Sequence, residues 1–338
     1  MSESTKRTDL ELRLGFKGLR GDDRPHVSVD GMTEHGPNLS HWPGNRTPKR
    51  YKRDLSTGIC LAFARAPESE RRDFLGGVEF VVNDHYDTDG FLSMLSLTRP
   101  SVALAREEVL LAAAGTGDFQ SFHTVRGFAI DRTVAGLSKP RSPVASEFDG
   151  LDGPSKDLAR TEWLIENAES VLDRPEDFEP IWRAELDLVV DELQTARLGK
   201  LRREPCRDAA MTVLRSNGPL HRMTLNTMAG AFRVLHVVEE DNGPLVRYHD
   251  RTESWFEVVT MTPPARRDLR EIAARLNELE SPSGEARWCA DAPTSPIPEL
   301  WFGLDEPQVY GRVTRTLHPT TLPIDTVVQE MRAALREG

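Results

Sequence analysis

An acidic segment with one histidine, NDHYDTDG at residues 83–90, carries the side chains best suited to chemistry. Asp84, His85, Asp87 and Asp89 lie within six positions, between two apolar runs. Carboxylate oxygens combined with an imidazole nitrogen suit Mn²⁺ or Mg²⁺ better than a metal that prefers soft ligands. Carboxylates this close repel one another unless a cation or hydrogen-bond donors offset their charge. The segment therefore predicts a divalent cation site.

A structural role for the same segment remains open. Aspartate and asparagine are common caps before helices, and Thr-Asp-Gly is frequent in turns. One calcium site is excluded by the spacing, because placing Gly90 at the sixth position of an EF-hand loop puts Ser96 where the bidentate glutamate belongs.

The segment DHYDTDGFLS, residues 84–93, resembles the first motif of the DHH phosphoesterase superfamily. In that motif a strand delivers a D-x-D-G or H-x-x-x-D-x-D turn to a pair of Mn²⁺ ions. The resemblance implies that His85, Asp87 and Asp89 are catalytic metal ligands and that the protein hydrolyses a phosphate ester or anhydride. Together with LSHWPGNRTP and GDF, the motif also resembles an uncharacterised bacterial family that spans most of the chain.

The rest of the superfamily pattern is incomplete in this sequence. The chain has no Asp-His-His triplet and no GGGH-like motif in its C-terminal part. Asp118, after a predicted helix and a glycine turn, is a candidate metal ligand as the carboxylate of the second motif, and His123, the nearest histidine, is a further candidate ligand. The structural alternative for Asp118 is an acid in a loop, and the structural alternative for His123 is a capping or partly buried histidine.

A second loop, LSHWPGNRTP at residues 39–48, offers candidates for substrate binding in His41, Asn45 and Arg46. A packed Trp-Pro turn is the structural alternative. The sequence contains no phosphate-binding P-loop, no GxGxxG, no GxSxG and no HExxH pattern.

Alternating strands and helices must position these residues. HVSVDG (26–31) reads as a strand, followed by a loop and a helix that begins with Thr47 as cap and Pro48 at its first position. VEFVVND reads as a buried strand, followed by a helix over GFLSMLSLTR and another over SVALAREEVLLAAAG. This order favours a parallel sheet. We expect strands 26–30 and 78–83 to be parallel neighbours, which would bring His41 near Asp87.

The predicted fold class is α/β, a DHH-like parallel sheet with flanking helices, joined to a helical segment and a C-terminal α+β region rich in hairpins. The predicted divisions are a polar arm (1–23), an α/β domain with the acidic loop (24–150), a helical connector (151–200) and a C-terminal domain (201–338). The connector should hold helices at 156–173 and 178–198. The C-terminal domain should hold strands in AAMTVLR, FRVLHVV, LVRYHD and SWFEVVT, a helix at 267–280 and a helix from Ile324.

Composition narrows the class of protein. The net charge of −11 argues against a protein that grips long nucleic acid over a wide face. Three scattered cysteines without a CxxC pair suit a reducing compartment and exclude a cysteine-based zinc site. The N-terminal residues do not read as a signal peptide, and no window is apolar for long enough to cross a bilayer. A cytoplasmic protein without membrane contact is expected.

The cation site and the resemblance to DHH phosphoesterases together imply a hydrolase of a small phosphate ester or anhydride that depends on Mn²⁺ or Mg²⁺. Two alternatives stay open. One is a biosynthetic enzyme that promotes intramolecular displacement of a phosphate or sulfate leaving group, forming a ring. The other is a non-catalytic binding protein on a DHH-like fold. In each case the expected partner is a small phosphorylated or sulfated molecule.

Overall fold

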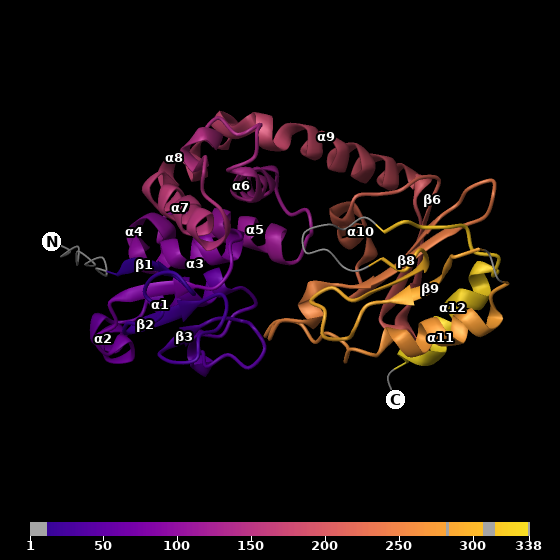
Figure 1. Ribbon diagram of the computed structural model, residues 1–338, viewed down its shortest axis with the longest axis horizontal. Coiled ribbons are helices and arrows are strands. Elements are labelled where there is room, and N and C mark those ends of the chain that lie inside the picture. Colours follow the sequence, from indigo (N-terminus) through magenta and orange to yellow (C-terminus); the bar gives the residue numbers. More distant parts are fainter. Residues whose placement is uncertain (1–11, 282–283, 307–314, 337–338) are drawn as a thin grey trace. The chain divides into compact units, whose positions relative to one another are not determined.

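A computed structural model describes residues 12–281, 284–306 and 315–336 (Figure 1). The chain divides into two compact units. Unit 1 comprises the chain up to Asp187 together with Phe256–Thr262, and unit 2 comprises Leu188–Trp255 with the chain from Pro263 onward. The predicted connector 151–200 is therefore not a separate region, because its helices as far as Asp187 belong to unit 1.

Unit 1 is built on a parallel sheet of the order β1-β4-β2-β3. The strands are β1 (Arg13–Phe16), β2 (His26–Val29), β3 (Asn38–Leu39) and β4 (Phe80–Asn83). The parallel pairing of β2 with β4, which aligns His26 with Phe80, confirms the predicted neighbours. Strand β1 corrects the prediction of a polar arm through residue 23. Four residues between charged segments give little periodic signal, yet they pair in register with β4 and bury Phe16.

The helices of unit 1 follow the expected order with shifted bounds. They are α1 (Ser56–Ala64), α2 (Glu68–Leu75), α3 (Thr88–Thr98), α4 (Pro100–Leu104), α5 (Glu107–Asp118), α6 (Val125–Gly136), α7 (Gly153–Glu166), α8 (Ala168–Asp173) and the first part of α9 (Glu179–Thr195). Pro48 precedes only a 3₁₀ turn, so the predicted first helix begins later, at Ser56. Residues 156–173 form two helices with a break at Asn167.

Helix α5 passes through the two glycines that were expected to end it. A Cβ added to Gly117 would lie 2.7 Å from Asp131 Oδ1 on α6. Gly117 therefore lets two helices pack closely instead of ending one of them. As a result Asp118 is the last residue of α5 and has a fixed place beside the sheet.

Unit 2 holds a mixed sheet of the order β5-β6-β7-β8-β10-β9. Its strands are β5 (Arg202–Cys206), β6 (Met211–Ser216), β7 (Arg233–Val238), β8 (Leu245–Asp250), β9 (Arg287–Ala290) and β10 (Glu299–Gly303). Most neighbours are antiparallel as predicted, but β6 and β7 are parallel and are joined through α10 (Arg222–Ala229). Helices α11 (Leu269–Leu279) and α12 (Ile324–Leu335) share the main apolar core with the sheet.

The strand predicted in SWFEVVT is wrong. Thr252–Ser254 form a 3₁₀ turn, and the following residues contain no strand. Alternating apolar residues suggested a strand, but Phe256–Thr262 belong to unit 1, where contacts with distant parts of the chain outweigh the local pattern.

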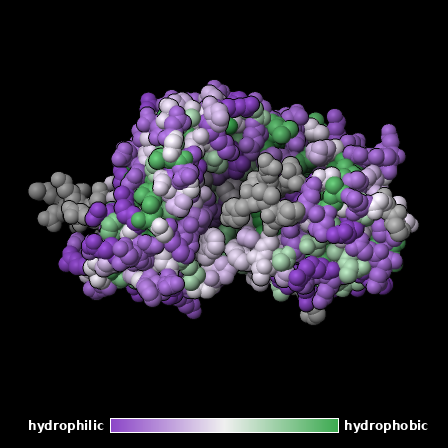
Figure 2. Space-filling model, viewed as in Figure 1, coloured by the Kyte–Doolittle hydropathy of each residue, from purple (hydrophilic) through white to green (hydrophobic). Residues whose placement is uncertain are grey.

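The surface in view is largely hydrophilic, with apolar residues in small scattered groups (Figure 2). Within the described residues, no helix combines the length and the apolar character that crossing a membrane requires.

Two buried histidines should make unit 2 sensitive to acid. Burial, aided by Arg247, lowers the pKa of His236 from 6.5 to about 4, and burial also lowers the pKa of His249. A depressed folded-state pKa means that the unfolded chain binds more protons below pH 6.5, so stability falls as the pH drops from 6.5 toward 4. For His236 alone the loss at pH 5 is about 2 kcal/mol.

The check is urea denaturation of the wild type and of His236→Gln at pH 7 and pH 5. Glutamine can keep the hydrogen bond that His236 Nε2 makes with Ser216 Oγ at 2.8 Å, but it does not titrate. We expect His236→Gln to lose about 2 kcal/mol less than the wild type between the two pH values. Equal losses of unfolding free energy in the two proteins would contradict a lowered pKa of His236 as the cause of the acid sensitivity.

Candidate metal centre

The candidate site lies where the strands of unit 1 end. Asp30 follows β2, His41 comes two residues after β3, and Asp84 follows β4. Asp89 lies in the first turn of α3, and Asp118 ends α5. Carboxyl ends of parallel strands meet at one edge of a sheet, and this edge is where open α/β folds bind ligands.

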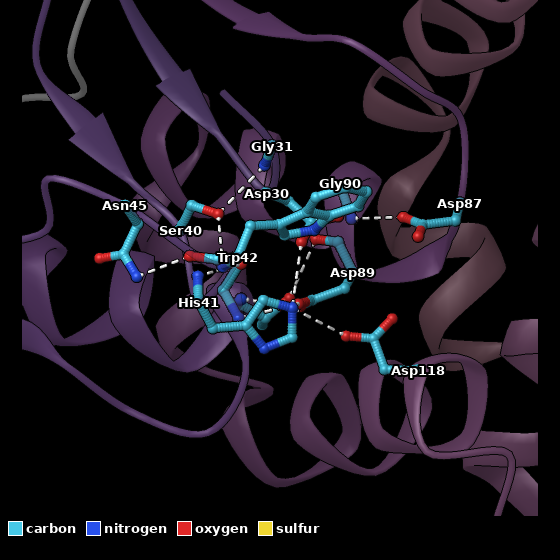
Figure 3. Close-up of polar contacts among 12 residues, drawn as sticks. Asp30, Gly31, Ser40, His41, Trp42, Asn45, Asp87, Asp89, Gly90 and Asp118 are labelled. Carbon is cyan, nitrogen blue, oxygen red and sulfur yellow. Dashed lines mark hydrogen bonds and ion pairs between the residues drawn. The ribbon is translucent and has the colours of Figure 1, made fainter. Parts of the chain in front are cut away.

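One group of possible metal ligands surrounds His41 (Figure 3). His41 Nε2 lies 3.5 Å from Asp30 Oδ1, 3.7 Å from Asp89 Oδ2 and 3.3 Å from Asp118 Oδ2. All four side chains are buried, and one ligand atom from each lies within 4.8 Å of the others. We call Asp30, His41, Asp89 and Asp118 the inner group. Three carboxylates and one imidazole match the ligand types that Mn²⁺ accepts.

A second group, which we call the outer group, consists of Asp30, His85 and Asp87. His85 Nε2 lies 3.3 Å from Asp30 Oδ2 and 3.1 Å from Asp87 Oδ2. His85 and Asp87 are only partly buried, unlike the members of the inner group. Asp30 is common to both groups, with Oδ1 facing His41 and Oδ2 facing His85. A carboxylate shared in this way suits a bridge between two cations.

Buried polar atoms without hydrogen bonds are found at Asp30 and His41. Among the described residues, both oxygens of Asp30 and Nε2 of His41 are buried and have no hydrogen-bond partner of suitable geometry. Asp30 also has a φ of 44°, a left-handed conformation that costs a residue other than glycine of order 1–3 kcal/mol. Buried charged atoms are normally paired or bound to metal. Strain and unsatisfied atoms thus coincide at the residue that the two groups share.

Hydrogen bonds fix which nitrogen of each imidazole faces the carboxylates. His41 Nδ1 lies 2.6 Å from the carbonyl oxygen of Asp54, which can only accept, so Nδ1 carries a hydrogen. His85 Nδ1 donates in the same way to Asp84 Oδ1 at 2.8 Å. Both histidines therefore direct Nε2 into the site. An outer partner that holds a ligating histidine in this orientation is typical of metal centres.

Two of the carboxylates accept hydrogen bonds from backbone N–H groups at helix N-termini. Both oxygens of Asp89 accept backbone N–H groups at the start of α1, from Ser56 at 2.8 Å and from Thr57 at 2.7 Å. Asp87 Oδ1 accepts from the N–H of Gly90 at 2.8 Å and caps α3, while Oδ2 faces His85. The capping role left open from the sequence is therefore real for Asp87, and its second oxygen remains directed at the outer group.

Two glycines make room for this arrangement. A Cβ at Gly31 would lie 2.2 Å from Asp84 Oδ1, and one at Gly90 would lie 1.9 Å from Asn83 Nδ2. Atoms cannot approach so closely, so a side chain at either position would displace the Asp84 carboxylate or the Asn83 amide. The glycine after Asp30 and the glycine after Asp89 are required by packing.

Burial and repulsion between carboxylates raise the pKa of Asp118 and of Asp89. Burial together with the nearby Asp89 and Asp30 raises the pKa of Asp118 well above its usual value. Burial and the charge of Asp30 raise the pKa of Asp89 to about 6. Burial opposes charging of His85, but Asp87, Asp30 and Asp84 raise its pKa well above 6.5. A divalent cation would offset the repulsion among these carboxylates.

The structure brings together most of the predicted site residues. His85, Asp87, Asp89 and Asp118, predicted as metal ligands, are members of the two groups. His123 is a correction: it is exposed in the loop after α5 and belongs to neither group among the described residues. His41 lies close to Asp89 and Asp118, among possible ligands and not in a separate substrate site.

Asn45 and Arg46, also predicted to bind substrate, make hydrogen bonds to nearby main-chain groups. Asn45 Nδ2 donates to the carbonyl oxygen of Trp42 at 2.8 Å, and Asn45 Oδ1 accepts from the N–H of Thr47. A guanidinium nitrogen of Arg46 donates to the carbonyl oxygen of Thr33 at 3.0 Å. The turn predicted as the structural alternative is therefore present.

Sequence reasoning missed Asp30. Its signal was the position itself, an aspartate followed by glycine directly after an apolar strand, which repeats the setting of the acidic segment after β4. A single acid in a turn was not distinguishable from ordinary turn chemistry.

Comparison with known proteins gives a family but no activity. No curated protein and no solved structure shows a significant match to the chain. A family model described as a family of unknown function, DUF6687, matches residues 14–338. The match covers both units and every residue of the inner and outer groups. The chain therefore belongs to the family of unknown function DUF6687.

Proposed function

We propose that this protein is a metal-dependent hydrolase of a small phosphate ester or anhydride, with Mn²⁺ or Mg²⁺ ions held by the inner and outer groups. The observation that carries the proposal is the sharing of Asp30 between the two groups. Two cations joined by a common carboxylate are typical of enzymes that hydrolyse phosphate esters.

When bound, two such ions supply a hydroxide near neutral pH and stabilise the attacking and leaving oxygens of an in-line displacement. The residues supply the geometry. His41 and His85 present Nε2 because their Nδ1 atoms are held by Asp54 and Asp84. Asp89 and Asp118 bring charge to the buried side, and Asp87 brings it to the partly exposed side.

The resemblance to the DHH phosphoesterase superfamily supports the same activity. Of the residues carried over from its first motif, His85 faces Asp30, Asp89 faces His41, and Asp87 faces His85. The Asp-His-His triplet is absent, and Asp30 and His41 offer ligands from the ends of β2 and β3. We infer a related chemistry reached with a different ligand set.

The acidic net charge of −11 favours a small substrate over long nucleic acid. The number of ions separates the proposal from its rivals. Two equivalents favour the hydrolase, and one favours an enzyme that expels phosphate or sulfate by intramolecular attack. No bound metal favours a binding protein or a metal-free transferase.

Replacing Asp87 should remove one equivalent of metal and leave the other. Asp87→Ser keeps an oxygen that can cap α3, so the change acts mainly on the outer group. We expect two equivalents of Mn²⁺ in the wild type and one in Asp87→Ser. Mn²⁺ at 100 times its dissociation constant stabilises the protein by about 2.7 kcal/mol per site, so the variant should also show a smaller rise in melting temperature.

The measurement is metal content after dialysis, combined with thermal unfolding with and without Mn²⁺. Asp73→Ser is the matched control, because Asp73 is an exposed residue of α2 that belongs to neither group. If Asp87→Ser still binds two equivalents of Mn²⁺, Asp87 is not a metal ligand.

A further inference from the structure

Residues Phe256–Thr262 form a return segment. They belong to unit 1, although the chain on both sides of them belongs to unit 2. The segment forms no helix or strand. Its contacts include the loop that carries His41, the residues that precede α1, and Phe119 after α5.

The return segment contacts His41 directly. The ring of Phe256 stacks on the His41 imidazole, with centroids 3.8 Å apart and planes 14° from parallel. The N–H of Glu257 donates to the carbonyl oxygen of His41 at 2.7 Å. One contact therefore covers a face of the imidazole, and the other holds its main chain. Together they restrict rotation of the ring that offers Nε2 to the inner group.

The return segment also holds the partner of His41 Nδ1. The carboxylate of Asp54 accepts from the N–H of Val259 at 2.5 Å, from the N–H of Thr260 at 2.9 Å and from the Thr260 hydroxyl. The carbonyl oxygen of Asp54 is the acceptor for His41 Nδ1. The side chain of Asp54 is thus bound to the return segment while its main chain sets the orientation of His41.

Glu257 of the return segment contacts both ends of the loop after His41. The carboxylate of Glu257 accepts from the N–H of Gly44 at 3.0 Å and from Lys52 Nζ at 2.6 Å. These contacts fix the segment between His41 and Asp54 at two further points. The loop is therefore held in one conformation from a part of the chain about 200 residues away.

We propose that the return segment positions His41 for metal binding. Phe256 stacks on the imidazole, and Val259 and Thr260 hold Asp54, whose carbonyl oxygen accepts from His41 Nδ1. This role rests on the proposed metal centre. Phe256, Asp54 and Thr260 are positioning residues that act through His41. Loss of an outer partner of a ligating histidine typically weakens metal binding 10–100-fold.

The test uses the full chain and Mn²⁺ as the probe. We expect Phe256→Ala and Asp54→Ala to weaken the binding of one equivalent 10–100-fold in calorimetric titration, and to leave the other equivalent near its wild-type affinity. Phe256→Tyr keeps the stacked ring and Asp54→Asn keeps an acceptor for the backbone N–H groups, so both should restore most of the affinity. Val259→Ala is the control, because the Val259 side chain is 49% exposed and its N–H is retained.

A spectroscopic measurement separates positioning from simple destabilisation. Visible absorption of bound Co²⁺ reports the geometry of the ligands, so it should change in Phe256→Ala and Asp54→Ala and remain as in the wild type in Val259→Ala. Affinity and Co²⁺ spectra that match Val259→Ala, in variants that stay folded, would overturn the positioning role alone. Absence of Mn²⁺ binding by the wild type would instead overturn the metal centre, and the positioning role with it.

Discussion

Asp30→Asn is expected to lose both equivalents of Mn²⁺, whereas His85→Ala should lose only one. Asp30 is the single residue common to the inner and outer groups, and each of its oxygens faces a different histidine. Removing its charge weakens both sites at once. The loss of Mn²⁺ affinity at each site should exceed the 10–100-fold loss that is typical when only an outer partner of a ligand is removed.

Asparagine is the informative replacement at position 30. Asn tolerates the left-handed backbone better than most residues, so the φ of 44° can be kept without added strain. Metal content after dialysis and calorimetric titration with Mn²⁺ give the number of sites and their affinities. Asp73→Asn, an exposed change on α2, is the control. One equivalent retained in Asp30→Asn would mean that the groups bind independently and that Asp30 does not bridge them.

The central strands of unit 1 and the acidic segment were predictable because their signals are local. β4 is an apolar run of a type found in buried strands, and β2 alternates before a turn. Two strands that each precede a helix favour parallel pairing, which the structure confirms. Ligand type and spacing predicted a cation site in this segment, and the resemblance to the DHH first motif implied His85, Asp87 and Asp89 as its ligands.

The rest of the site depends on contacts that spacing does not encode. Phe256 reaches His41 across more than 200 residues, and its alternating neighbours favoured a strand that does not form. Asp30 becomes distinctive only when β2 and β4 lie side by side and place it between two histidines. His123 was chosen for its closeness in sequence to Asp118, yet the chain turns after α5 and leaves its side chain exposed.

Loss of the Asp89 charge should abolish most of the turnover. With Mn²⁺, we expect the wild type to release phosphate or a nucleotide from a substrate in a screen of nucleotides, dinucleotides, inorganic pyrophosphate and sugar phosphates. Asp89→Asn should reduce the rate by about 10²-fold or more, because a carboxylate of the inner group orients the ion that stabilises charge in the transition state.

Thr57→Val separates this effect from damage to the fold. Asp89 holds the start of α1 through the N–H groups of Ser56 and Thr57, so Asp89→Asn also costs stability. Thr57→Val loses the hydroxyl that donates to the carbonyl oxygen of Asp89 but leaves the carboxylate in place. It should lower the melting temperature and change the rate by only a small factor. A rate loss in Thr57→Val as large as that in Asp89→Asn would assign the effect to structure.

A screen without any Asp89-dependent turnover would leave the hydrolase without support. An enzyme that expels phosphate or sulfate by intramolecular attack would still fit that result, because it turns over only a substrate that carries its own nucleophile. Such an enzyme needs a cation to stabilise the departing anion but no metal-bound water. One equivalent of Mn²⁺ in the wild type, absent turnover in the screen, would therefore favour this reaction over hydrolysis.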